Sequence, residues 1–362
     1  MIAPEPRGPR LRELGLTIGR YDVGLHDAIT DVSGVTVGHV TIWRNEPEPP
    51  VGRGIARTGV TTVVPASPDT LFAEPVPAGV AVLNGAGELT GSIAISEWGL
   101  LETPVYLTST HAVGRVYDGA VAAAVEADAS VGTDQVVIPV VGECDDSWLS
   151  DARVVQVEVG DARRALTAAT SGPVAEGAVG AGTGMLTKGF KAGIGTSSRL
   201  VPSIDAALGV LVLANFGGPP GLIVDGVDVG NGSGRENVRQ AAGSCIVVVA
   251  VDAALSSHQL ERVARRAGLG LARTGSIAHH GSGEIFLAFA PPGRQPRRQS
   301  AVPPVPDVSL DDVFEATVDA TEEAVLNALW AAPEVSGRGG NTAPALPHDD
   351  VVALLEKHGR LG

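Results

Sequence analysis

Apolar positions along the chain follow two periods. Short runs rich in Val, Ile, Leu and Thr, bounded by Gly or Pro, predict β-strands, whereas Ala- and Val-rich stretches at helical spacing predict α-helices. The predicted strands lie at 34–43, 59–65, 79–84, 104–110, 135–143, 208–217, 245–252 and 284–290. The predicted helices lie at 91–99, 113–127, 160–172, 256–268 and 310–331, followed by a short helix in the C-terminal tail. Because strands and helices interleave throughout and no linker divides them cleanly, we expect one layered α/β domain over residues 1–362.

Four segments lack such a period. Residues 1–20 have the composition of an irregular arm, and the Pro- and Arg-containing stretch 291–309 that of an exposed linker. The glycine-dense segment 177–195 is too irregular for a phosphate loop, and it favours close backbone packing or a strand that lines a substrate site. The Gly-, Asp- and Asn-rich segment 217–242 is typical of a surface excursion.

Composition mainly excludes classes of protein. Of 362 residues, 44% are apolar, which is typical of a globular chain with a sizeable core. The formal net charge of -15 opposes nucleic acid as a partner. No apolar run approaches the roughly 20 residues of a membrane helix, so no membrane partner is expected. The N-terminal segment lacks the pattern of a secretory signal, which makes the cytoplasm the expected compartment.

The chain also lacks the usual sequence signatures of several enzyme classes. Glycine-rich dinucleotide and P-loop motifs, a nucleophile elbow and the zinc-binding H-E-x-x-H and C-x-x-C spacings are all absent. We therefore expect no metal site, and dinucleotide and P-loop nucleotide binding lose their strongest signatures. The adjacent His279 and His280 point apart in regular structure and are interpreted as a solvated loop pair. Cys144 and Cys245 are expected to be buried and reduced.

The dipeptide Gly243-Ser244 directly precedes the apolar strand 245–252. A serine hydroxyl is a poor nucleophile without a base, but an amino-terminal serine carries its own α-amine, with a pKa of roughly 7.7–8.0. Cleavage before Ser244 would create such a terminus, and glycine at 243 leaves the preceding carbonyl open to attack. On these two residues alone, a simple turn into a strand remains the competing interpretation.

Three further polar residues stand at the ends of predicted strands. Ser282 and Glu284 are two residues apart at the start of a strand, so they can face one side, where the carboxylate would orient a hydroxyl or an ammonium. The alternative is a polar turn with a solvated Glu284. Asn215 lies near the C-terminal end of the strand 208–217, where it would donate to a developing oxyanion or serve only the turn that follows.

Two other groups are candidates for substrate binding. The acidic cluster of Glu143, Asp145, Asp146 and Asp151 follows the strand 135–143 and would receive a substrate ammonium group. A solvated acidic turn is the competing interpretation, which we prefer for Asp151. In the segment "NGAGE", Asn84 and Glu88 either line a pocket, or Asn84 serves only a turn.

Together these motifs resemble one family. "AITDVSGVTVGH", "NGAGELTG", "EGAVGAGTGM", "KAGIGTSSR", "GSCIVVVAVDA", "ARTGSIAHHGSGEIFLAF" and "PALPHD" follow one another in the order found in the DmpA-type aminopeptidases. This is the L-aminopeptidase/D-esterase and β-peptidyl aminopeptidase group of self-processing, N-terminal-nucleophile-like hydrolases. The resemblance spans nearly the whole chain.

The resemblance implies a four-layer α/β/β/α sandwich that is cleaved between Gly243 and Ser244 into an α chain, 1–243, and a β chain, 244–362. It also implies assembly as a homotetramer of such heterodimers, without metal or cofactor. Ser244 would be the nucleophile that releases N-terminal amino acids from short peptides, amides or esters through an acyl-enzyme. An acyltransferase, or a hydrolase of non-peptide linear amides, is the alternative on the same fold.

The same resemblance assigns roles to the remaining candidates. Ser282 and Glu284 match the assisting serine and glutamate, Asn215 matches the oxyanion-hole asparagine, and Glu143 matches the acidic residue that binds the substrate's amino group. One stretch departs from the pattern. It reads "ECDDSWLSD" where many members read roughly "ETYDGYLND", so Asp145 stands in place of an aromatic hydroxyl. The preferred substrate therefore stays open.

Overall fold

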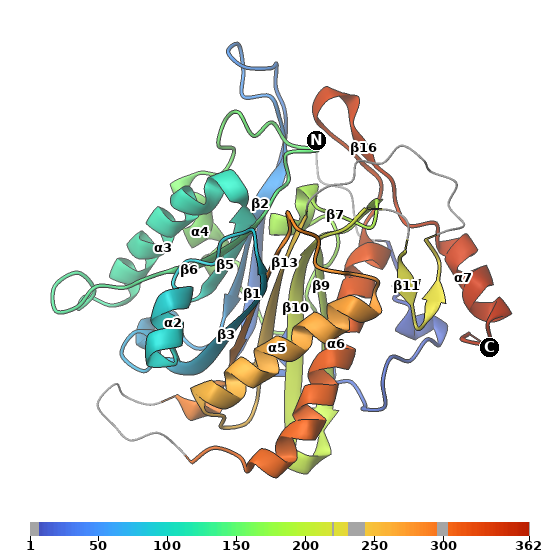
Figure 1. Ribbon diagram of the computed structural model, residues 1–362. Helices are drawn as coiled ribbons and strands as arrows, with labels where there is room; N and C mark the ends of the chain where they lie inside the picture. The colour runs from blue at the N-terminus through green and yellow to red at the C-terminus, as the bar shows by residue number, and fades with distance from the viewer. Residues whose placement is uncertain (1–6, 219–220, 231–242, 295–302, 362) are drawn as a thin grey trace.

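The structure is a computed structural model that describes residues 7–218, 221–230, 243–294 and 303–361. Two β-sheets pack face to face in its centre (Figure 1). The larger sheet has the order β4 (Leu100–Leu101), β3 (Val76–Gly85), β14 (Gly283–Phe289), β13 (Ser244–Val251), β10 (Ala206–Asn215) and β9 (Ile194–Val201). The smaller sheet has the order β1 (Thr36–Asn45), β2 (Ile55–Val64), β5 (Val105–Ser109) and β6 (Val140–Cys144).

Helices cover the outer face of each sheet. The larger sheet carries α5 (Ser257–Arg273) and α6 (Leu310–Ala331), and the smaller sheet carries α3 (Val113–Ala127) and α4 (Val159–Thr167), as Figure 1 shows. This order of layers is the α/β/β/α sandwich that the sequence resemblance implies. The peripheral elements are α1 (Pro68–Leu71), α2 (Ser92–Trp98), α7 (His348–Lys357) and the strand pairs β7–β8 (Leu186–Thr187, Phe190–Lys191), β11–β12 (Ile223–Val224, Val227–Asp228) and β15–β16 (Val335–Ser336, Thr342–Ala343).

Strand β13 lies in the middle of the larger sheet and is buried along its whole length. It is covered on both faces, which is why its sequence is a continuous apolar run instead of an alternating one. Successive side chains nevertheless point to opposite faces. Val247 and Val249 pack in the core beneath α5 and α6, whereas Ile246 and Val248 pack in the core between the two sheets.

Most predicted elements are present, and α3 and α6 have the predicted bounds. Strand β6 begins at Val140 and not at 135, and α5 continues five residues past its predicted end, from Gly268 to Arg273. The excursion 217–242 contains the hairpin β11–β12 in its described part, whereas 219–220 and 231–242 lie outside the described residues. The described ends of the linker 291–309 contain short 3-10 helices.

The sequence did not predict β9. Its residues Thr196 to Arg199 are polar, yet the strand is buried between β10 and α6. The polar groups are satisfied by acids from elsewhere in the chain. The Thr196 amide donates to Glu176 at 2.9 Å, and the Arg199 guanidinium pairs with Glu323 of α6 at 2.6 Å. A strand whose buried positions are polar lacks the apolar signal on which the prediction depends.

Candidate active site

The polar residues from three separate sequence regions meet at one end of the larger sheet. Ser244 is the first residue of β13 and pairs with Asn215, the last residue of the antiparallel β10. On the other side, β14 runs parallel to β13, and its pairing sets Cys245 opposite Glu284. The strand register therefore brings together residues that the sequence separates widely.

The pleat of the strands determines where these side chains point. Ser244 shares its face of β13 with Ile246 and Val248, and Asn215 shares its face of β10 with Leu213. These three apolar residues belong to the core between the sheets. Ser244 and Asn215 therefore face the space between the two sheets, at its open end.

Gly243 lies against the backbone of β10. A Cβ atom on this residue would stand 1.9 Å from the carbonyl oxygen of Asn215, so only glycine fits without moving a strand. The next residue is held equally closely: Ser244 is 6% exposed, and its Oγ accepts a hydrogen bond from the Gly283 amide at 3.2 Å. The peptide bond before Ser244 thus lies in a tightly packed and defined position.

Ser282 and Glu284 form a buried pair beside β13. The Ser282 hydroxyl donates to Glu284 Oε1, and Glu284 is 1% exposed, so it is not the solvated turn residue of the alternative interpretation. Burial raises the pKa of Glu284, and the hydrogen bond from Ser282 lowers it. Its Oε2 accepts no hydrogen bond from any residue that the structure describes. That oxygen is available to a cationic group.

The carboxamide of Asn215 is fixed at both ends. Its Oδ1 accepts from the Leu186 amide and its Nδ2 donates to the Asp145 carbonyl, each at 2.9 Å. An amide nitrogen carries two hydrogens, so one remains for another acceptor. The arrangement suits a preorganised donor to an oxyanion.

Glu143 reaches the same region from the smaller sheet. It is the penultimate residue of β6, is 4% exposed, and accepts hydrogen bonds from the Glu88 amide at 3.0 Å and from the Thr110 hydroxyl. Burial raises the pKa of Glu143, and these two bonds lower it. A Cβ atom on Gly87 would stand 3.1 Å from Glu143 Oε1 and 3.7 Å from Ser244 Oγ. Glu143 and Ser244 therefore both lie beside the loop that contains Gly87.

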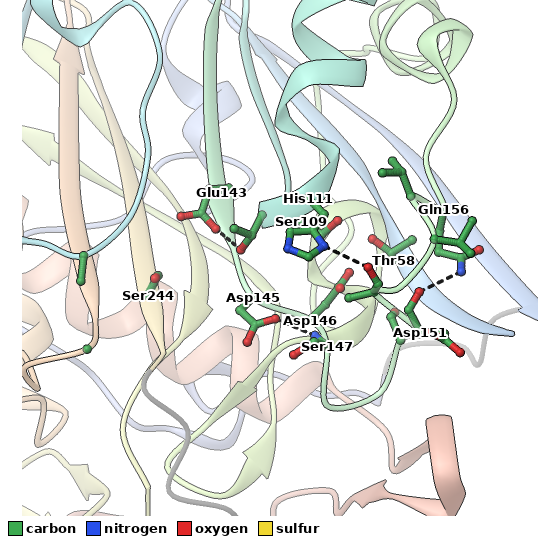
Figure 2. A pocket seen from close by; sticks show the side chains of 17 residues that line it. Thr58, Ser109, His111, Glu143, Asp145, Asp146, Ser147, Asp151, Gln156 and Ser244 are labelled. Carbon is green, nitrogen blue, oxygen red and sulfur yellow. Dashed lines mark hydrogen bonds between the residues drawn. The ribbon is translucent and has the colours of Figure 1, made fainter. Parts of the chain in front are cut away.

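A cavity of about 410 Å³ opens beside Ser244. Figure 2 shows Ser244 on one side and the acidic side chains Glu143, Asp145, Asp146 and Asp151 among the residues that line the rest. All four predicted acids therefore face one space. Its size falls in the range of small-molecule sites.

The acids of this cavity differ in environment. Asp145 is exposed, whereas Asp146 is 4% exposed and burial raises its pKa to about 7. Asp151 is fully buried and is held by Arg153 at 2.6 and 2.9 Å, so the preferred interpretation of a solvated Asp151 is wrong. The guanidinium of Arg153 lowers the pKa of Asp151.

Asn84 is not among the residues that line this cavity. Its Nδ2 donates to the carbonyl oxygens of His279 at 3.0 Å, His280 at 3.3 Å and Ser282. Asn84 therefore holds the loop that leads into β14, which makes it a positioning residue in this structure. Both histidines are exposed, as a solvated pair would be.

Three contributors were not found from the sequence: the Gly283 amide, the Thr110 hydroxyl and the Gly87 loop. A backbone amide and a single threonine carry no recognisable motif, and only the "NGAGELTG" match marked the loop.

Among the described residues, no group of His, Cys, Asp and Glu is arranged to hold a metal ion. In the same part of the chain, no helix is long and apolar enough to cross a membrane.

Comparisons with known proteins agree with this geometry. The model of peptidase family S58 matches residues 27–343. The β-peptidyl aminopeptidase BapA of Sphingosinicella microcystinivorans is 39% identical over 383 residues, which cover 99% of this chain and 95% of that protein.

Solved structures show the same likeness. The PH0078 protein from Pyrococcus horikoshii OT3 superimposes with a TM-score of 0.92 at 38% identity, over 98% of this chain and 100% of that chain. The L-aminopeptidase D-Ala-esterase/amidase from Ochrobactrum anthropi, described as a prototype of the serine aminopeptidases with a variant of the Ntn hydrolase fold, gives 0.91 at 40% identity with the same coverage. The chain therefore belongs to peptidase family S58, which confirms the family, the fold class and the enzyme class, a serine aminopeptidase, that its motifs predict.

Proposed function

We propose that Ser244 is the nucleophile of this aminopeptidase and becomes competent when the chain cleaves itself between Gly243 and Ser244. The mature protein would then release N-terminal residues from short peptides, amides or esters. One observation carries the proposal: Ser244, the Ser282–Glu284 pair and Asn215 converge at one strand end, beside a cavity that also contains Glu143.

The cleavage uses the serine hydroxyl. Ser244 Oγ attacks the Gly243 carbonyl carbon, the C–N bond breaks, and the acyl group passes from nitrogen to oxygen as an ester. Water then hydrolyses the ester, which leaves a carboxylate on Gly243 and a free α-amine on Ser244. The absence of a side chain at Gly243 and its close approach to Asn215 support this step, because they hold the scissile peptide in a fixed position.

In the mature protein, the Ser244 α-amine acts as general base for its own hydroxyl. The amine takes the Oγ proton as Oγ attacks the substrate carbonyl, and it returns the proton to the leaving amine. Water then resolves the acyl-enzyme. In this proposal the Ser282–Glu284 pair orients the α-amine and stabilises its charged form, and the remaining Asn215 N–H stabilises the oxyanion.

Glu143 explains the requirement for a free amino terminus. It is a buried carboxylate that lies, like Ser244, beside Gly87, and both of its oxygens are oriented by donors. A substrate α-ammonium bound there would be paired and partly desolvated. An acylated terminus carries no charge and would leave the carboxylate unpaired in the cavity, which is costly.

The fragments 1–243 and 244–362 would remain one domain after cleavage. β10 and β13 pair from Leu208–Val251 to Asn215–Ser244, so the two fragments share the larger sheet. We also propose, on the sequence resemblance, that the heterodimers assemble as a homotetramer. The cytoplasm is the proposed compartment on the sequence argument given above.

The function is tested with paired substrates that differ only in the amino terminus. We expect the wild-type protein to hydrolyse an aminoacyl anilide and not its N-acetyl derivative. Ser244→Ala should hydrolyse neither and should stay uncleaved. Equal rates on the two substrates would contradict the role of Glu143, and an active Ser244→Ala protein would contradict the nucleophile.

A further inference from the structure

The cavity beside Ser244 has an unbalanced charge. Four carboxylates line it, from Glu143, Asp145, Asp146 and Asp151, and no lysine or arginine side chain of the described residues does. A cavity with one sign of charge attracts ligands of the opposite sign. The question is which of the four acids remains available to a ligand.

Three of the acids are already accounted for. Glu143 is proposed to bind the substrate α-ammonium, and Asp151 is paired with Arg153. Asp146 is buried, and burial raises its pKa to about 7, so it carries little charge below neutral pH. Asp145 is different: it is exposed in the cavity, its Oδ1 accepts a hydrogen bond from the Ser147 amide at 2.8 Å, and no ion pair involves it among the described residues.

The position of Asp145 is fixed relative to the reacting groups. Its carbonyl oxygen accepts a hydrogen bond from Asn215 Nδ2 at 2.9 Å, so its backbone contacts the proposed oxyanion donor. It also lies two residues after Glu143, and both side chains line the same cavity. Burial raises the pKa of Glu143, and among the smaller effects the negative charge of Asp145 raises it further. The two carboxylates therefore repel each other, and two positive charges on a ligand would relieve that repulsion.

We propose that Asp145 selects substrates whose N-terminal residue carries a second positive charge on its side chain, as lysine, ornithine and arginine do. This inference rests on the proposed function, because it assumes that Glu143 binds the α-ammonium. The α-ammonium then pairs with Glu143 and the side-chain cation with Asp145, while the scissile carbonyl faces Ser244. A cavity of about 410 Å³ has room for such a side chain.

The test compares lysine p-nitroanilide with norleucine p-nitroanilide, which keeps the unbranched side chain and lacks the ammonium. We expect the wild-type protein to favour lysine in kcat/KM by about fivefold, the range of a solvent-accessible ion pair. Asp145→Asn should abolish this preference, and Asp145→Glu, which keeps the charge, should retain it. Asp118→Asn removes one negative charge from the exposed face of α3, outside the cavity, and serves as the matched control.

A second measurement on the wild-type protein does not depend on any variant folding or maturing. The lysine preference should fall as salt rises from about 10 mM to about 1 M, because the Debye length shrinks from about 30 Å to about 3 Å. A wild-type preference for norleucine, a ratio insensitive to salt, or an unchanged ratio in Asp145→Asn would overturn the inference. Norleucine p-nitroanilide separates the two proposals: its Ser244-dependent hydrolysis upholds the proposed function, and no hydrolysis of either anilide by cleaved protein refutes that function itself.

Discussion

The ends of the two sheets contribute differently to the site. At the end of the larger sheet, Ser244, Ser282, Glu284 and Asn215 are all buried and contact one another or the backbone. At the end of the smaller sheet, Glu143 and the segment after it direct carboxylates into an open cavity. The first arrangement fixes reacting groups in place, and the second offers charge to a ligand.

We propose that the larger sheet carries out the chemical step and that the smaller sheet binds the substrate. The larger sheet sets the reacting groups by strand register, which tolerates little change. The segment 145–158, which follows β6, contains no strand or helix, so strand register does not place its acidic side chains. We therefore expect substitutions at the larger sheet to lower the cleavage rate or kcat, and substitutions at the smaller sheet to raise KM.

The largest effect is expected at Gly243. In Gly243→Ala the new Cβ would collide with the Asn215 carbonyl oxygen, which must displace the scissile bond. A misplacement on the order of 1 Å can cost on the order of 100-fold in rate, so uncleaved precursor should accumulate. The ratio of precursor to fragments over time, read by denaturing electrophoresis, measures this. Gly114→Ala in α3 is the control, because a Cβ there has no neighbour within 4 Å. Normal maturation of Gly243→Ala would show that close packing is not needed.

Glu284→Gln should have the next largest effect. Glutamine keeps the shape and can accept the Ser282 hydrogen bond, but it cannot balance an ammonium on Ser244. We expect kcat to fall by about 100-fold with a smaller change in KM, because the loss affects general base catalysis. Rates should be normalised to the cleaved fraction, determined by mass spectrometry. If only KM changed, Glu284 would act in substrate binding, which would contradict the proposed division of roles between the two sheets.

Glu143→Gln tests the smaller sheet in the same way. Removing the charge should raise KM for an aminoacyl anilide by about tenfold, the cost of losing a hydrogen bond to a charged group. We expect kcat to change less, because the larger sheet is untouched. Steady-state kinetics on the cleaved protein give both constants. A fall in kcat alone would argue that Glu143 acts in the chemical step.

The smallest expected effect is a difference between the wild-type protein and Glu143→Gln in how KM depends on pH. The pKa of Glu143 is raised by burial, so Glu143 becomes protonated at a higher pH than an exposed glutamate as the pH falls. KM should therefore rise on the acid side in the wild-type protein and stay flat in Glu143→Gln. In both proteins, kcat should fall as the pH falls through the pKa of the Ser244 α-amine. That pKa is roughly 8 in a free amino terminus. Parallel KM profiles would contradict the role of Glu143.

The sequence predicted the helices and the apolar strands well because the residues that these elements bury are apolar. Helix α3 repeats Ala and Val at helical spacing, and β13 is an unbroken apolar run. Strand β9 was missed because its polar side chains are buried against acids from distant segments, as Ser197 is against Asp27 and Arg199 against Glu323, a relation visible only in three dimensions.

The same limit applies to the site, because contacts between distant segments are visible only in three dimensions. Family motifs pointed to Ser244 and Glu143 as candidates, but spacing in the chain could not show that β10 and β14 flank β13 at Ser244. It also could not show that Asn84 supports a loop and lies outside the cavity, or that Asp151 is buried and paired with the half-exposed Arg153. Such contacts depend on the register of strands and on loop packing.

The claim that severing the backbone before Ser244 activates its hydroxyl is tested most directly by intact-mass measurement on freshly purified, active protein, with activity followed as fragments appear. We expect two polypeptides, 1–243 and 244–362, and activity that rises in proportion to the fragment that begins with Ser244. A preparation that hydrolyses aminoacyl amides while every molecule remains a single chain of 362 residues would contradict the account.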